Sequence, residues 1–237
     1  MCYEYTGYGR STAGAAPSEE SCYSDIRAVM NYLSSVHGVK PKRVVLYGRS
    51  LGTAVSVRLA EVQEARSAPV RGIILQSPFA SALRVACGAC KTTPVGDQFV
   101  TVDRIHKLRS KVLIVHGMLD AIVPAAHGLE LWNALDPSAV PHTAPLFVAS
   151  AGHNNVEAVC EREGDTLIRT LAVFLTELSA LHAWSGAVAV AASSGANAAA
   201  GRTGHCASAR RSATVSGQGL GVRRPPSPTR AAAPSPT

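Results

Sequence analysis

The chain has 237 residues, of which 46% are hydrophobic and 16% are charged, a composition that excludes disorder throughout. No run of 18 apolar residues suits a membrane-spanning helix, and no secretory signal is visible at the N-terminus. The formal net charge is +7, but residues 185–237 hold six arginines and no acidic residue, which leaves 17 basic and 16 acidic residues in 1–184. This near-neutral part excludes a basic nucleic-acid groove, and we expect no nucleic-acid partner.

Strand and helix signals alternate from the N-terminus to residue 184. In chain order they predict a strand at 2–5, a helix at 18–36, a strand at 43–47, a helix at 51–65, strands at 72–75 and 111–116, a helix at 128–135, a strand at 145–149 and a helix at 166–181. Continuously apolar strands that alternate with helices predict an α/β fold with a mostly parallel sheet flanked by helices. The pattern fails at 77–108, which we interpret as a connection over one end of the sheet.

Residues 185–237 form a second region. They are rich in Ala, Ser, Arg and Pro and cannot bury enough apolar surface to offset the entropy of ordering. We therefore predict one domain at 1–184 and a disordered tail at 185–237.

Six cysteines are spread along the chain. Without a visible secretory signal, reduced thiols and a cytoplasmic location are expected. Cys87 and Cys90 form a lone Cys-x-x-Cys, which lacks the second pair of a zinc site, so we predict two ordinary thiols and no metal site.

The strongest signal for chemistry is Gly48-Arg49-Ser50-Leu51-Gly52, between the predicted strand 43–47 and helix 51–65. A Gly-x-Ser-x-Gly in this position is typical of a nucleophile elbow, in which the glycines avoid collisions and the serine projects from a tight turn. The Leu51 amide at the start of the helix is the predicted oxyanion donor. The alternatives are a glycine-rich phosphate-binding turn and an ordinary strand–helix turn.

A serine nucleophile needs a base and an orienting acid. His153 follows the predicted strand 145–149, and Asp120 follows the predicted strand 111–116. The order Ser50, Asp120, His153 is that of α/β-hydrolases, and all three lie on loops at one end of the sheet. They are the predicted catalytic residues, and no metal or organic cofactor is required.

Other histidines and aspartates compete for these roles. His116 closes a predicted strand and is the alternative base, although a packed histidine is favoured there. The remaining candidates are placed at helix ends, on the surface or away from strand ends: His37, His127, His142, Asp25, Asp97 and Asp103.

Several motifs besides the elbow are similar to those of one family. They lie at residues 3–11, 46–53, 76–78, 81–85, 112–120, 127–129 and 152–154. Through them the chain, from about residue 3 to residue 178, resembles the serine hydrolases called abhydrolase domain-containing protein 17. The resemblance implies an α/β-hydrolase fold and hydrolysis of acyl thioesters, with Ser50, Asp120 and His153 as the triad. It also implies S-acylated protein substrates, removal of palmitate at the cytoplasmic face of membranes, and peripheral membrane association.

The chain also departs from this family. Members begin with three further strands and a loop that supplies a second oxyanion amide, so we expect an N-terminally truncated hydrolase. The strand 43–47 should then have an open edge, which invites pairing with other chains, and the strand 2–5 should be loose or shifted into the gap. A poorly soluble, nearly inactive chain is expected. The alternatives to a thioesterase are a catalytically impaired hydrolase remnant and a prolyl-peptidase-like serine hydrolase.

Overall fold

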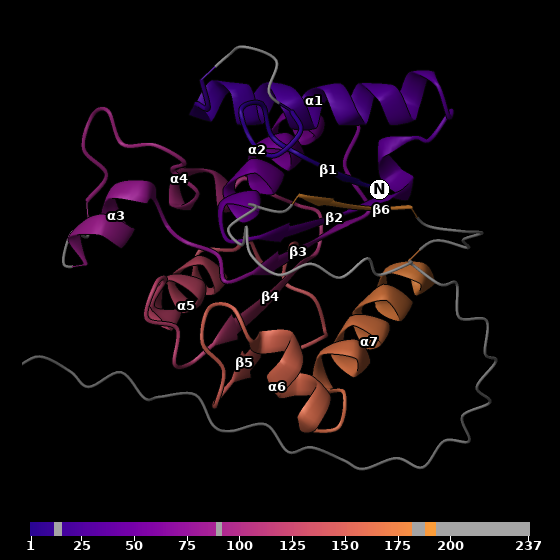
Figure 1. The fold of residues 1–237 in the computed structure, drawn as a ribbon. Coiled ribbons are helices and arrows are strands. Elements are labelled where there is room, and N and C mark those ends of the chain that lie inside the picture. The colour runs from indigo at the N-terminus through magenta and orange to yellow at the C-terminus, as the bar shows by residue number, and fades with distance from the viewer. Residues whose placement is uncertain (12–15, 89–91, 182–187, 193–237) are drawn as a thin grey trace, which may run out of the picture. The chain divides into compact units, whose positions relative to one another are not determined.

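The computed structural model describes residues 1–11, 16–88, 92–181 and, for the backbone alone, 188–192. Within them, six strands form one parallel sheet in the order β1-β6-β2-β3-β4-β5 (Figure 1). The strands are β1 (Cys2–Tyr3), β2 (Val44–Arg49), β3 (Gly72–Gln76), β4 (Val112–Gly117), β5 (Leu146–Val148) and β6 (Val188–Ala192). The predicted parallel α/β fold is confirmed.

Helices cover both faces of the sheet. They are α1 (Glu19–Ser35), α2 (Leu51–Ala65), α3 (Ala82–Cys87), α4 (Val102–Ile105), α5 (Ala125–Asn133), α6 (Val156–Arg162) and α7 (Thr166–Ala180), with a 3-10 turn η1 at Pro41–Arg43. The Ser18 hydroxyl accepts a hydrogen bond from the Ser21 amide and caps α1. Residues of α1, α2 and α5 share one buried cluster with one face of the strands, and residues of α6 and α7 share another with the opposite face.

The strands alternate their side chains between these two clusters. On β2, Val44 and Leu46 belong to the cluster under α1 and α2, whereas Val45 belongs to the cluster under α6 and α7. Ile73, on β3, shares the first cluster and Ile74 the second. Burial on both faces explains why the strands are continuously apolar in sequence.

The place next to β2 corrects two predictions. β6 pairs in parallel with β2 from Val44 to Gly48 and with β1 at Cys2 and Tyr3. Residues 188–192 therefore belong to the sheet and not to a disordered tail, and β2 has no open edge. β1 lies beside β6 and has not shifted against β2. The rest of the predicted tail, 185–187 and 193–237, lies outside the described residues.

The physical reason is the hydrogen-bonding capacity of a central strand. An unpaired edge of β2 would leave a row of amides and carbonyls without partners, and any extended segment within reach gains by pairing with it. Composition predicts how much apolar surface residues 185–237 can bury, but it does not predict which backbone groups residues 188–192 pair with.

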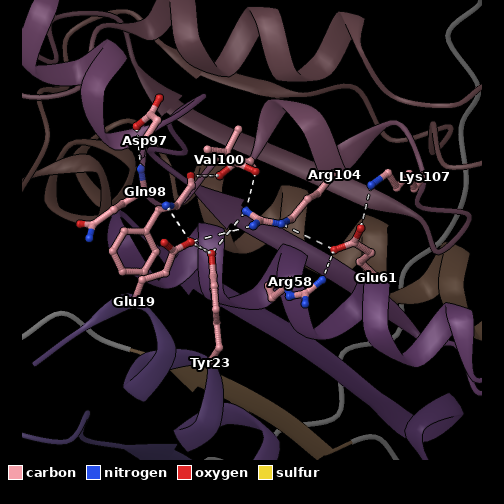
Figure 2. A network of polar contacts seen from close by, with 11 residues as sticks. Glu19, Tyr23, Arg58, Glu61, Asp97, Gln98, Val100, Arg104 and Lys107 are labelled. Atoms are coloured by element: carbon pink, nitrogen blue, oxygen red, sulfur yellow. Dashed lines mark hydrogen bonds and ion pairs between the residues drawn. The ribbon is translucent and has the colours of Figure 1, made fainter. Parts of the chain in front are cut away.

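The connection 77–108 holds the short helices α3 and α4 and is tied to α1 and α2 by a polar network (Figure 2). One Glu19 carboxylate oxygen accepts hydrogen bonds from the Tyr23 hydroxyl at 2.6 Å and from the Phe99 amide at 2.9 Å. Arg104 donates to the Val100 carbonyl at 2.6 Å. The Glu19 carboxylate thus ties the connection to α1.

Glu61 on α2 forms the second half of this network (Figure 2). Its carboxylate lies 2.7 Å from Arg58, 2.9 Å from Lys107 and 3.6 Å from Arg104. Burial alone would raise the pKa of Glu61, but the hydrogen bonds from Lys107 and Arg58 outweigh it and hold the pKa below its ordinary value. The carboxylate is therefore charged where it meets the three cations.

One cysteine differs from expectation. Cys87 at the end of α3 is disulfide-bonded, whereas Cys2, Cys22 and Cys160 are free thiols. The prediction of a reduced Cys87 is wrong because it rested on the expected compartment alone, which does not decide the state of an individual thiol.

Candidate active site

The elbow lies where β2 ends at Arg49 and α2 begins at Leu51. Ser50 between them has φ 49° and ψ −119°, a conformation that costs energy for a residue with a side chain. A Cβ on Gly48 would collide with the Gly52 carbonyl and lie 2.8 Å from the Ser56 hydroxyl. Gly48 is required because the backbone of the next helix comes too close for any side chain.

The structure brings the three predicted catalytic side chains together at the carboxyl edge of the sheet. His153 Nε2 lies 3.0 Å from Ser50 Oγ, and His153 Nδ1 lies 2.7 Å from Asp120 Oδ2. Since a carboxylate only accepts hydrogen bonds, Nδ1 carries a proton and Nε2 is free to accept from the Ser50 hydroxyl. The Asp120 side chain is fully buried and that of His153 is 9% exposed.

The Asp120 carboxylate is oriented by its own loop. Its Oδ1 accepts hydrogen bonds from the amides of Ile122 at 3.0 Å and Val123 at 2.8 Å. These bonds leave Oδ2 directed at His153, so the loop after β4 sets the acid in place before substrate is involved.

His116, the alternative base, lies elsewhere. It is fully buried, and its Nε2 donates to the Val123 carbonyl at 2.9 Å and lies 3.4 Å from Asp120 Oδ2. Burial lowers the pKa of His116, so it is neutral. It packs behind Asp120, and the hydrogen-bond partner of Ser50 is His153.

The position of Leu51 suits the predicted oxyanion donor. Leu51 is the first residue of α2, and amides in the first turn of a helix have no intrahelical acceptor. The positive end of the helix dipole adds to the attraction for a negative oxygen beside Ser50.

Sequence reasoning missed three polar side chains next to the triad. Arg49 contacts the loop that carries His153. Gln76 donates to Glu157 on the helix after that loop and accepts a hydrogen bond from the Tyr47 hydroxyl. For Tyr47 and Arg49, the signal that could have found them is the alternation of side chains along β2, which places residues 47 and 49 on the same face.

The described part of the chain holds a cavity, but neither a metal site nor a membrane-spanning helix. No group of three or more His, Cys, Asp or Glu there could hold a metal ion, and no helix there has the length and hydropathy to span a membrane. A cavity of about 590 Å³ is lined by the segments before β2, β3 and β4, among them Lys42, Arg71 and Lys111. Because the strands are parallel, it lies at the amino edge of the sheet, opposite Ser50.

The fold is that of the α/β-hydrolase class. The chain superposes on an alpha-beta hydrolase from Vibrio vulnificus with a TM-score of 0.52 and 20% identity, over 65% of this chain and 58% of that one. It superposes on a monoacylglycerol lipase from Paleococcus ferrophilus with a TM-score of 0.50 and 18% identity, over 73% and 80%.

Residues 6–180 match the prolyl oligopeptidase family, and the chain belongs to that family. It is 39% identical over 155 residues to alpha/beta hydrolase domain-containing protein 17B of Homo sapiens, and 41% identical over 155 residues to protein 17C of Xenopus tropicalis. These alignments cover 65% of this chain and 50% and 46% of the relatives. The chain thus spans about half the length of the curated relatives it matches, and the resemblance found in the sequence is confirmed.

Proposed function

We propose that the chain is a serine hydrolase of esters and thioesters, with Ser50 as nucleophile, His153 as base and Asp120 as the group that orients the base. The observation that carries the proposal is the continuous hydrogen-bond chain from Ser50 Oγ through His153 to Asp120 Oδ2, with distances of 3.0 and 2.7 Å. The strained elbow beneath Ser50 supports the same role.

The mechanism follows from this geometry. Ser50 Oγ attacks the acyl carbon while its proton passes to His153 Nε2, and Asp120 stabilises the imidazolium that forms. The Leu51 amide donates to the oxyanion. When the tetrahedral intermediate collapses, the bond to the leaving thiol or alcohol breaks and His153 returns the proton to it. Water then attacks the acyl-enzyme by the same route and frees Ser50 and the acid.

For the substrate we propose S-acylated protein cysteines, as the likeness to the domain-containing protein 17 group suggests. Residues 1–184 are nearly neutral in charge, and we therefore propose no nucleic-acid partner. We further propose action at the cytoplasmic face of membranes with peripheral association, and no cofactor.

A fluorophosphonate probe tests the proposal, because it reacts only with an activated serine. The full chain should be labelled at Ser50, and Ser50→Ala and His153→Ala should lower both labelling and hydrolysis of short p-nitrophenyl esters at least about a thousandfold. Ser56→Ala, which changes a buried serine of α2, is the matched control. A chain that melts cooperatively but is not labelled would instead be the impaired remnant.

A second candidate function is a prolyl-peptidase-like activity, favoured by the family match over residues 6–180. The same triad would then attack a peptide carbonyl, and His153 would protonate a leaving amine. Comparing kcat/KM for a palmitoylated-cysteine thioester peptide with that for a proline p-nitroanilide separates the two. A higher value for the anilide would reject the thioesterase.

A further inference from the structure

Arg49 and Tyr47 project from the face of β2 that carries α6 and α7. Side chains alternate along a strand, and Val45 on this face packs in the cluster under α6 and α7. Val44 and Leu46 pack in the opposite cluster. Arg49 therefore leaves the elbow on the side where the chain passes from β5 through His153 into α6.

The Arg49 guanidinium binds the segment that carries the base. Its Nη2 donates to the main-chain carbonyl of His153 at 3.2 Å and to Asn154 Oδ1 at 2.9 Å. Among the described residues Arg49 forms no ion pair. The Arg49 guanidinium thus donates to two neutral oxygens and, within the described residues, to no carboxylate. This arrangement indicates that Arg49 holds the segment in place and does not serve to balance a surface charge.

A second polar contact holds the far end of the same segment. The Tyr47 hydroxyl donates to Gln76 Oε1, and Gln76 Nε2 donates to Glu157 Oε1 at 2.9 Å. Gln76 is fully buried, so its amide is held at both ends. Two neighbouring central strands, β2 and β3, thereby hold the five residues 153–157.

The base needs such support because it follows a three-residue edge strand, β5. The main chain before it is fixed by the Leu119 amide, which donates to the Ala151 carbonyl at 2.8 Å. The Gly152 amide is bound by the Asn155 side chain of the same loop. In the described part of the chain, the carbonyl oxygen of His153 itself accepts its hydrogen bond from Arg49.

We propose that Arg49 is a positioning residue for the base. Arg49 precedes Ser50, so the backbone that fixes the nucleophile also fixes the main chain of His153 and keeps Nε2 in reach of Oγ. The inference rests on the proposed function, since it assigns Arg49 a role in the reaction of Ser50. A misplacement of about 1 Å in a reacting group can cost on the order of a hundredfold in rate.

The test uses the full chain with Arg49→Met, Arg49→Lys and Asn154→Ala. The control is Arg66→Met, at an exposed arginine after α2. Three quantities are measured: kcat and KM for a p-nitrophenyl ester, the melting temperature, and the low-field proton resonance of the His153 Nδ1–H···Asp120 bond, assigned with Asp120→Asn.

Arg49→Met should lower kcat roughly ten- to a hundredfold, with KM changed by less than about threefold and melting close to that of Arg66→Met. Arg49→Lys, which keeps one donor, should recover part of kcat, and Asn154→Ala should lose less than Arg49→Met. The low-field resonance should shift or broaden in Arg49→Met and stay unchanged in Arg66→Met.

The two proposals fail in different ways. An unlabelled, inactive parent chain would overturn the hydrolase proposal, but the resonance would still show whether Arg49 places the imidazole. An unchanged resonance in Arg49→Met overturns the positioning role, as does kcat equal to the control or a loss that follows melting alone.

Discussion

The two parts of the sheet are held together differently. The part from β2 to β5 is buried on both faces, and Ser50, Asp120 and His153, the candidate catalytic residues, all follow its strands. The part formed by β1 and β6 joins the sheet through short pairings, five residues between β6 and β2 and two between β1 and β6. The first part is specified by its own apolar sequence, whereas the second depends on a distant segment reaching the edge of β2.

The candidate site is complete on one part of the sheet, while the other part decides whether β2 has an exposed edge. The triad contacts involve β2, β4 and β5 and the loops after them. β6 contributes backbone pairing beside the elbow strand. Stability and activity should therefore respond to different changes.

Deleting residues 188–237 should have the largest effect on stability. It removes β6, and β2 then loses the partner of Val44–Gly48. Each lost backbone hydrogen bond is worth about 0.5–1.5 kcal/mol, so we expect a loss of several kcal/mol and oligomers in size-exclusion chromatography. The matched deletion of 199–237 should melt within about 2 °C of the parent. Equal melting of the two truncations would contradict the pairing of β6.

In the part from β2 to β5, the next largest effect is expected from a core substitution on β4. Ile114 on β4 is fully buried, and Ile114→Ala should lower the free energy of unfolding by about 2–5 kcal/mol through lost burial and a cavity. Met118→Ala, in the exposed loop after β4, should change it by less than about 0.5 kcal/mol. Urea unfolding measures both, and similar costs would show that β4 is not a central core strand.

His116 should make the well-packed part sensitive to acid. Burial lowers its pKa below the ordinary 6.5, so below about pH 6.5 the unfolded chain binds a proton that the folded chain does not. Stability therefore falls as pH falls. The destabilisation caused by His116→Gln should therefore become smaller between about pH 8 and pH 5.5, by at most about 1.4 kcal/mol. A pH-independent cost of His116→Gln would contradict a buried neutral imidazole.

The smallest effect is expected in the network of Figure 2. Lys107, half exposed, contacts Glu61 at 2.9 Å, and Lys107→Met should cost less than about 0.5 kcal/mol because exposed ion pairs contribute little. Arg104→Met should cost more, since Arg104 also donates to the Val100 carbonyl in the connection. Thermal melts of the two variants compare them, and an equal or larger cost for Lys107→Met would show that the network does not fasten the connection through Arg104.

Much of the fold and the candidate site could be predicted from local pattern. The apolar runs at 43–47, 72–75 and 111–116 predicted buried parallel strands because burial on both faces leaves no polar alternation. Ser50, Asp120 and His153 could be chosen because parallel strands bring their following loops to one edge. The close approach of backbone at the elbow could be predicted from sequence because it leaves no room for a side chain, and only glycine fits there.

Local sequence was sufficient to locate the buried strands, the elbow and the loops that share an edge, because burial on both faces and a close approach of backbone restrict the residue types at neighbouring positions. Only the tertiary structure decided that residues 188–192 pair with β2, that Arg49 reaches the carbonyl of His153, and that His116 lies behind Asp120. These are contacts between segments as many as 144 residues apart, from Val44 to Val188. They depend on hydrogen-bond geometry in space, which leaves no periodic signal in the chain.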